Sequence, residues 1–143
     1  MFIGEYQHNI DEKGRLAVPV KFRTDLKKGA VVTKEVDDCL SIYTREEWNK
    51  YADKVAALPS SKADARAFAR LKLGSAMDVE IDGQGRMLIP EYLRKDNGLM
   101  KRVVIIGLYS RLEIWDEDRW NRYKAKTNAK SGKIAESLGE MGV

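Results

Sequence analysis

The sequence predicts a mainly β domain with added helices, formed by a tandem duplication within one chain. Its 143 residues are the length of one ordinary domain. Residues 11–23 recur as 82–94 at an offset of 71, with five of thirteen positions identical. Residues 31–51 recur as 103–123 at an offset of 72. Two matching blocks in the same order indicate a repeated structural unit.

Each repeat is predicted to open with a turn between two short strands. In the first repeat, 5–10 is strand-like, and 11–14 forms a turn in which Gly14 supplies a positive φ. Residues 15–18 form the return strand of this hairpin. Pro19 keeps the residue before it extended and begins a short helix. The corresponding parts of the second repeat are 82–85, 86–89 and Pro90.

A second hairpin and a helix complete each repeat. The expected strands are 31–36 with 39–43, and 103–108 with 111–115. Thr44 and Glu47 form a capping box that predicts a helix start, and Trp120 begins the equivalent helix. The alanine-rich segment 61–73 predicts a helix that joins the repeats. The polar tail after Lys124 is expected to be frayed, or ordered only by contact with a neighbour.

These elements divide the chain into four parts. They are a first repeat (5–47), a helical linker region (48–75), a second repeat (76–119), and a helical start followed by a polar tail (120–143). One repeat alone has little core to bury, so we expect the two to share one core. Two hairpins from each, related by a pseudo-twofold axis, predict a small closed barrel without exposed strand edges.

Composition excludes several functional classes. The longest apolar run, 103–108, is far shorter than the ~20 residues of a membrane helix. The lone Cys39 is typical of a protein of the reducing cytoplasm, and with His8 as the single histidine there is little material for a zinc site or a catalytic triad. A net charge of +4 is compatible with nucleic acid binding.

The repeated Gly-Arg followed by Pro, with a further Arg beyond it, resembles the DNA-binding half of AbrB-like swapped-hairpin proteins. The start MFIGEYQHNIDEKGRLAVPVKFR, the linker DARAFARLKLGSA and the block EIDGQGRMLIP look closely like the MraZ family. The resemblance runs to about residue 123. It implies a swapped-hairpin barrel of two AbrB-like repeats within one chain. It further implies a bacterial transcription regulator, encoded with cell-division and cell-wall genes, that acts in the cytoplasm at the nucleoid.

The resemblance also implies partners and site residues. The expected partners are promoter DNA with short direct repeats and further copies of the chain in a ring, with no membrane, small-molecule substrate, metal, cofactor or catalytic residue. The residues expected to contact DNA are Arg15, Arg86, Lys13, Arg23 and Arg94. For Arg23 and Arg94, which lie one to two helical turns after a proline, solvation on the helix surface is an open alternative to a phosphate contact. The residues expected to support the turns are Asp11, Gly14, Asp82 and Gly85. Lys13 has Gln84 as its equivalent, so its role is asymmetric.

Other interpretations of the same residues remain open. Arg15 and Arg86 could serve only to fix the turns by pairing with the nearby aspartates. The basic stripe on the linker (Lys62, Arg66, Arg70) is typical of a solvated or intersubunit face, and the tryptophans and tyrosines are expected to pack rather than stack on bases. The alternative functions are an antitoxin-type autoregulator of the same fold and a structural ring protein without DNA affinity. An enzyme has the least support.

Overall fold

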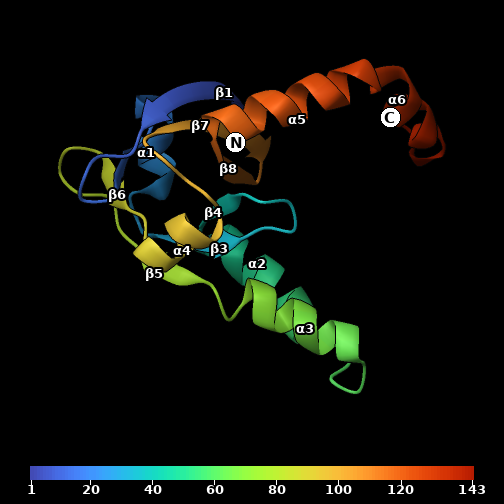
Figure 1. Ribbon diagram of the computed structural model, residues 1–143. Helices are drawn as coiled ribbons and strands as arrows, with labels where there is room; N and C mark the ends of the chain where they lie inside the picture. Colours follow the sequence, from blue (N-terminus) through green and yellow to red (C-terminus); the bar gives the residue numbers. More distant parts are fainter.

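The computed structural model describes residues 1–143 and contains eight strands, six α-helices and a short terminal 3₁₀ turn (Figure 1). The strands are β1 (Phe2–Asn9), β2 (Arg15–Ala17), β3 (Ala30–Lys34), β4 (Leu40–Thr44), β5 (Met77–Val79), β6 (Arg86–Leu88), β7 (Arg102–Tyr109) and β8 (Arg111–Asp116). The helices are α1 (Val20–Leu26), α2 (Arg45–Ala56), α3 (Ala63–Lys72), α4 (Glu91–Asp96), α5 (Glu117–Ala129), α6 (Ser131–Ser137) and the 3₁₀ turn η1 (Gly139–Met141).

The strands confirm a mainly β fold built from two interleaved repeats. Six of them form an antiparallel sheet in the order β1-β7-β8-β4-β3-β5, and β2 pairs with β6 in a separate ribbon. The equivalent strands of the two repeats are β1 and β5, β2 and β6, β3 and β7, and β4 and β8. When each strand of the sheet is replaced by its equivalent, the same strand order is obtained in reverse. The pseudo-twofold axis passes where Leu16 pairs with Met87 and where Ser41 pairs with Glu113, because these pairs occupy equivalent positions of the two repeats.

The predicted pairing of each return strand within its own repeat is wrong. β2 meets its own repeat only at the isolated bridge from Ile10 to Leu16, and β6 only at that from Ile81 to Met87. β1 pairs instead with β7 of the other repeat along its whole length. The exchange buries Leu16 and Met87 completely. Single bridges therefore join the ribbon to the ends of the sheet, and the expected closed barrel does not form as one continuous ladder.

One hydrophobic core serves both repeats, as the sequence predicts. It is a single cluster of 19 buried side chains. Its members include side chains of the ribbon strands β2 and β6 and of the short helices α1 and α4, namely Leu16, Phe22, Leu26, Met87 and Leu93. The ring of Phe22 makes edge-to-face contacts with Phe2 and Tyr6, at centroid separations of 5.2 and 5.3 Å. The short helices after Pro19 and Pro90 thus close the core beneath the ribbon.

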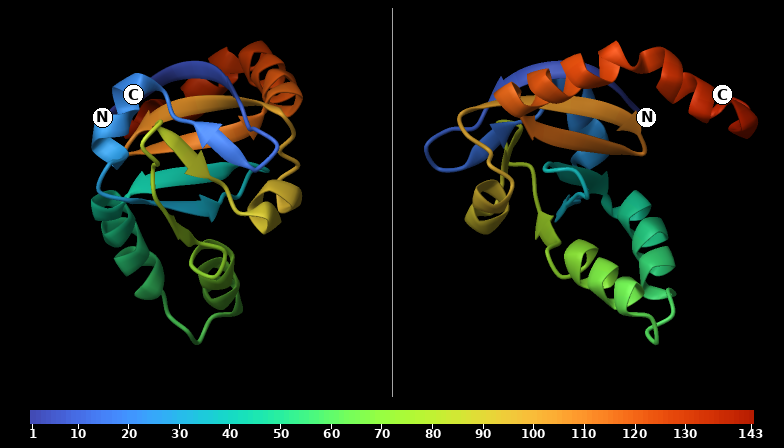
Figure 2. Two further views of the ribbon diagram at one scale, coloured as in Figure 1. Left: turned by 90° about the vertical axis from the view of Figure 1, so that its left-hand side faces the viewer. Right: turned by 45° about the vertical axis from the view of Figure 1, so that its right-hand side comes forward.

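Two helical arms leave the sheet on the side away from the β2–β6 ribbon (Figures 1 and 2). One consists of α2 and α3, and the other of α5 and α6. The side chain of Thr44 accepts a hydrogen bond from the Glu47 amide at 3.1 Å, as the capping box predicts. The tail after Lys124, expected to be frayed, is helical, because α5 continues to Ala129 and α6 follows with every side chain exposed. None of the helices combines the length and apolar character needed to span a membrane.

Candidate nucleic-acid interface

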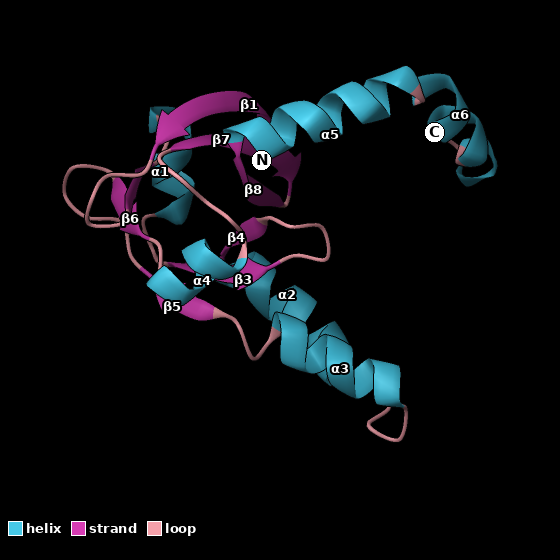
Figure 3. Cartoon of the chain, in the orientation of Figure 1, coloured by secondary structure: helices cyan, strands magenta, loops and turns pink.

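The β2–β6 ribbon places Arg15 and Arg86 on one face of the molecule. Side chains alternate between the two faces of a strand. Because Leu16 and Met87 point into the core, Arg15 and Arg86 point outward, at opposite ends of the ribbon. Figure 3 shows the turns that precede them, 11–14 and 82–85, as loops on the same side of the chain. The two arginines therefore share a face and are related by the pseudo-twofold axis.

An aspartate organises each turn and holds its arginine. Oδ1 of Asp11 accepts hydrogen bonds from the backbone amides of Lys13 and Arg15 at 3.0 and 2.9 Å, and Oδ2 accepts from Arg15 Nε at 2.7 Å. The Arg15 amide, followed by the Arg15 side chain and charge and the Lys13 amide, lowers the pKa of Asp11 against a smaller opposing effect of burial. The carboxylate therefore stays ionised and holds the arginine side chain in one direction.

The second turn repeats this arrangement with nearly the same distances. Oδ1 of Asp82 accepts from the amides of Gln84 and Arg86, both at 2.9 Å, and Oδ2 accepts from Arg86 Nε at 2.9 Å. The amide of Arg86 contributes most to a lowered pKa of Asp82, and the amide of Gln84 also contributes. The turn chemistry is thus a property of the repeated sequence, and it occurs twice.

The ion pairs leave the outer edge of each guanidinium available. Arg15 and Arg86 use Nε within the chain, and neither donates a hydrogen bond from its terminal amino groups to another residue of the chain. Their side chains are 30% and 29% exposed. A guanidinium held by its Nε and open at its two amino groups can donate to two acceptors side by side, which is the pattern that guanine presents in the major groove. Turn support and DNA contact are therefore compatible roles for the same side chain.

The tips of the two turns differ. The first carries Glu12 and Lys13, and the second carries Gly83 and Gln84, with all four exposed. The Lys13 side chain makes no hydrogen bond or ion pair within the chain and extends from the first turn only. The paired surface is consequently symmetric at its arginines and asymmetric at its tips.

Arg23 and Arg94 lie beside the turns but are engaged by the backbone. Arg23 Nε donates to the carbonyl oxygen of Val18 at 2.9 Å, and Arg94 Nε donates to that of Ile89 at 2.9 Å. Both side chains are half-buried. The structure therefore brings these arginines to the candidate interface, with their Nε groups committed to the fold.

Two lysines beside the turns are not among the residues that the sequence predicted to contact DNA. Lys101 lines a groove of about 540 Å³ with Asp11 and Arg94, and Lys27 lines the opposite groove of about 520 Å³ with Asp82 and Arg23. Their positions are not equivalent in the two repeats, so the internal alignment gave no signal for them. Only the excess of basic over acidic residues, six against three in 11–28 and five against three in 82–102, pointed to this region.

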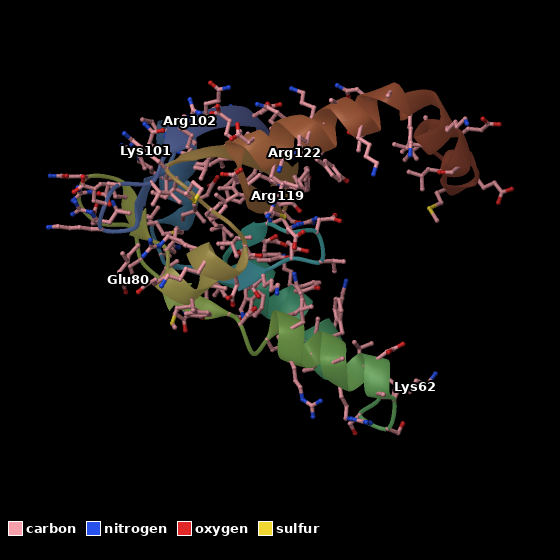
Figure 4. The ribbon with its side chains drawn as sticks, in the orientation of Figure 1. Lys62, Glu80, Lys101, Arg102, Arg119 and Arg122 are labelled. Carbon is pink, nitrogen blue, oxygen red and sulfur yellow. The ribbon has the colours of Figure 1, made fainter.

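The basic stripe on α3 lies elsewhere. Lys62 stands at the tip of the α2–α3 arm, at the opposite end of the molecule from Lys101 (Figure 4). Arg66 donates from Nη1 to the carbonyl oxygen of Ser60 at 3.0 Å, which ties the stripe to its own arm. The stripe therefore belongs to the α2–α3 arm and not to the surface that carries the turns.

The aromatic residues pack in two equivalent clusters, as predicted. Tyr43 contacts Trp48 and stacks on Tyr51 in the first repeat, both at 5.5 Å between ring centroids. Trp115 contacts Trp120 at 5.4 Å and Tyr123 at 4.9 Å in the second. Both clusters fix a long helix to the end of a hairpin, away from the turns (Figure 1).

The remaining chemically active residues form no second centre. No three histidine, cysteine, aspartate or glutamate side chains are grouped to hold a metal ion. Cys39 is fully buried, and burial, together with the charges of Glu113 and Glu35, raises the pKa of its thiol. Burial and the charge of Arg23 lower the pKa of His8, a half-buried residue of β1.

Comparison with known proteins accounts for nearly the whole chain. The family described as "MraZ protein, putative antitoxin-like" matches residues 1–71 and again 73–138. The two matched segments correspond to the two halves of the interleaved fold.

Curated relatives match over nearly their full length. A protein of Desulforamulus reducens is 44% identical over 141 residues, covering 99% of both chains. Proteins of Heliobacterium modesticaldum and Ligilactobacillus salivarius are 47% and 48% identical over 138 residues, covering 96% of both chains in each case. All three are named transcriptional regulators of the same family.

Proposed function

The chain belongs to the MraZ family and is a transcriptional regulator; from this premise we propose that it binds promoter DNA sequence-specifically through Arg15 and Arg86. The observation that carries the proposal is the doubled arrangement in which an aspartate holds each arginine by Nε and leaves its terminal amino groups open. The proposal assigns no catalytic residue, metal or cofactor to the chain.

Further residues have defined roles in this proposal. Asp11, Gly14, Asp82 and Gly85 shape the two turns. Lys13 adds a phosphate contact from the first turn only, since Gln84 replaces it in the second. Lys27 and Lys101 add positive charge in the grooves beside the turns. Phosphate contacts fix the protein on the duplex, whereas base contacts select the sequence.

Specific binding by one chain is weak, because two arginine–guanine contacts contribute only about 1–3 kcal/mol each. We therefore propose that several chains bind together, as a ring whose turns meet successive direct repeats of a promoter. Linked binding sites raise the effective concentration of each further contact when the spacing matches. The proposed promoters are those of cell-division and cell-wall operons, and the protein acts at the nucleoid in the cytoplasm.

A gel-shift titration with salt on the promoter of its own gene tests the proposal. Arg15→Ala and Arg86→Ala should each lower specific affinity at least about tenfold, because each removes a bidentate base contact. Lys62→Ala, at the far tip of the α2–α3 arm, is the matched control and should at most reduce the salt slope by about one. Normal operator binding by both arginine variants overturns the proposal.

The same titration separates the alternatives. A structural ring protein would show no salt-dependent affinity for the promoter. An antitoxin-type autoregulator, suggested by the family's description, would bind DNA and would also need a segment that engages a toxin. The exposed helix α6 offers such a segment. In an antitoxin, deletion of 131–143 would abolish binding of the toxin and leave promoter binding unchanged.

A further inference from the structure

Arg23 and Arg94 each reach from one repeat to the turn of the other. Gly14 and Gly85 have φ angles of +84° and +76° and lie directly beneath these side chains. A methyl group added to Gly14 would lie 2.7 Å from Arg94 Nη2 and 2.8 Å from its Cζ. A methyl group added to Gly85 would lie 2.7 Å from Arg23 Cδ and would also overlap its guanidinium. Each guanidinium therefore covers the backbone of a turn that belongs to the other repeat.

The backbone makes the same crossing. The amide of Val18 donates to the carbonyl oxygen of Gly85, and the amide of Ile89 donates to that of Gly14, both at 2.9 Å. The carbonyl oxygens of Val18 and Ile89 are in turn the acceptors for Arg23 Nε and Arg94 Nε. Val18 and Ile89, which precede the two prolines, therefore each make two contacts. The carbonyl oxygen holds the arginine of the same repeat, and the amide holds the turn of the other repeat.

We propose that Arg23 and Arg94 are positioning residues that act across the repeats. Arg23 holds the turn that presents Arg86, and Arg94 holds the turn that presents Arg15. Gly85 directly precedes Arg86, and Gly14 directly precedes Arg15, so a change in either glycine's backbone redirects the arginine that follows it. The proposal rests on the proposed function for its effect on DNA binding, but not for its effect on the turns.

Substitution by lysine separates positioning from a direct phosphate contact. Lysine keeps the positive charge, and a phosphate contact tolerates it because an ammonium group also binds phosphate. It lacks both the Nε–H group that meets Val18 or Ile89 and the flat guanidinium that covers the glycine. Arg23→Lys and Arg94→Lys should therefore behave like Arg23→Gln and Arg94→Gln.

Amide hydrogen exchange of the free protein tests the crossing directly. Arg23→Lys should raise exchange in the turn 82–86 about tenfold and leave 11–15 unchanged, because the second turn loses its cover. Arg94→Lys should do the reverse. Faster exchange in the turn of the same repeat, or equally in both turns, overturns the proposal. Wild-type far-UV circular dichroism and cooperative melting establish that each variant is folded.

A double-mutant cycle on the promoter duplex tests the consequence for binding. Arg23→Lys alone should lower affinity about tenfold with an unchanged salt slope. In the Arg86→Ala background, Arg23→Lys should lower the affinity by less than about twofold, because the arginine that Arg23 positions is already absent. Added to Arg15→Ala it should keep its full effect. Equal effects in the two backgrounds overturn the proposal.

The two experiments fail independently. If neither Arg15→Ala nor Arg86→Ala changes promoter binding, the proposed function is wrong, and the exchange pattern still decides whether the arginines act across the repeats. If the arginine variants abolish binding while exchange shows no crossing, the function stands and the positioning role is wrong.

Discussion

Lys72 Nζ lies 2.6 Å from Glu35 Oε1, with 1% of the lysine side chain and 15% of the glutamate side chain exposed. The pair joins the last residue of α3 to the β3–β4 hairpin. Ser41 Oγ donates to the same carboxylate oxygen at 2.6 Å, and the ammonium group lies over the ring of Tyr51. A buried charge pair therefore fixes the helix that links the two repeats, and this makes the linker part of the fold.

Removing the lysine should destabilise the protein strongly. Lys72→Met leaves the buried carboxylate of Glu35 without its main partner, which costs about 3 kcal/mol of unfolding free energy. Urea denaturation followed by circular dichroism measures the change. Lys50→Met, which breaks exposed pairs with Glu46 and Glu47 on α2, should cost much less, because solvent screens exposed ion pairs. Equal losses in the two variants would show that the pair contributes no more than a surface contact.

Stability should fall in acid through the same carboxylate. Burial acts to raise the pKa of Glu35, but the hydrogen bonds from Lys72 and Ser41 and the charges of Lys72 and Arg111 lower it below 4.5. A group with a lowered folded-state pKa contributes stability above its unfolded pKa and loses it as the pH falls. Melting temperatures should be steady above about pH 5 and decrease below about pH 4. Glu35→Gln should flatten this decrease, and an unchanged acid profile in that variant would assign the effect to other groups.

Two glycines of the second turn should respond oppositely to alanine. Gly85→Ala forces a side chain into a positive φ and against Arg23, so it should cost more than about 1 kcal/mol. Gly83 has open space where its Cβ would be and no positive φ, so Gly83→Ala should be neutral or stabilise by up to about 1 kcal/mol. Thermal melts of both variants check the contrast. A larger loss at Gly83 would contradict the geometry of this turn.

Cys39 should be inert in the folded protein. Its side chain is completely buried, and its raised pKa keeps the thiol protonated at neutral pH. Ellman's reagent should therefore react with no thiol in the native protein and with one after denaturation in guanidinium. Rapid reaction without denaturant would mean that the β3–β4 turn opens readily.

Local sequence features predicted the turns and the two hairpins β3–β4 and β7–β8, but not the partners of β1 and β2. Asp11 and Arg15 are close in sequence, so their contact follows from the turn itself. The partner of β2 does not follow from the local sequence. The alternation of Leu16 with its neighbours is compatible both with a hairpin inside one repeat and with pairing to the other repeat. For the same reason, the sequence predicted Arg23 and Arg94 only as DNA contacts or as solvated residues of a helix surface, and not as partners of the opposite turn. Their contacts with Gly85 and Gly14 exist only because the repeats interleave.

Contacts that occur in only one of the repeats could also not be predicted from local sequence patterns. Nothing in the helical spacing of Lys72 marks it as buried, since its partner Glu35 lies in a different element of the first repeat. The helix α5 is likewise held by a contact between residues far apart in the sequence. Lys124 pairs with Glu5 of β1 at 3.0 Å, and this contact anchors α5 to the first strand of the chain.

The pairing of β1 with β7 has a consequence for how the protein is made. β1 leaves the ribosome long before its partner β7, which begins only at Arg102. Until then, the emerging chain holds a complete first repeat with unpaired strand edges and half of a core. Neighbouring unfinished chains on the same messenger carry identical free edges, and pairing between them would give swapped, misassembled products. The interval between the synthesis of β1 and that of β7 is therefore the period in which this protein is most exposed to aggregation.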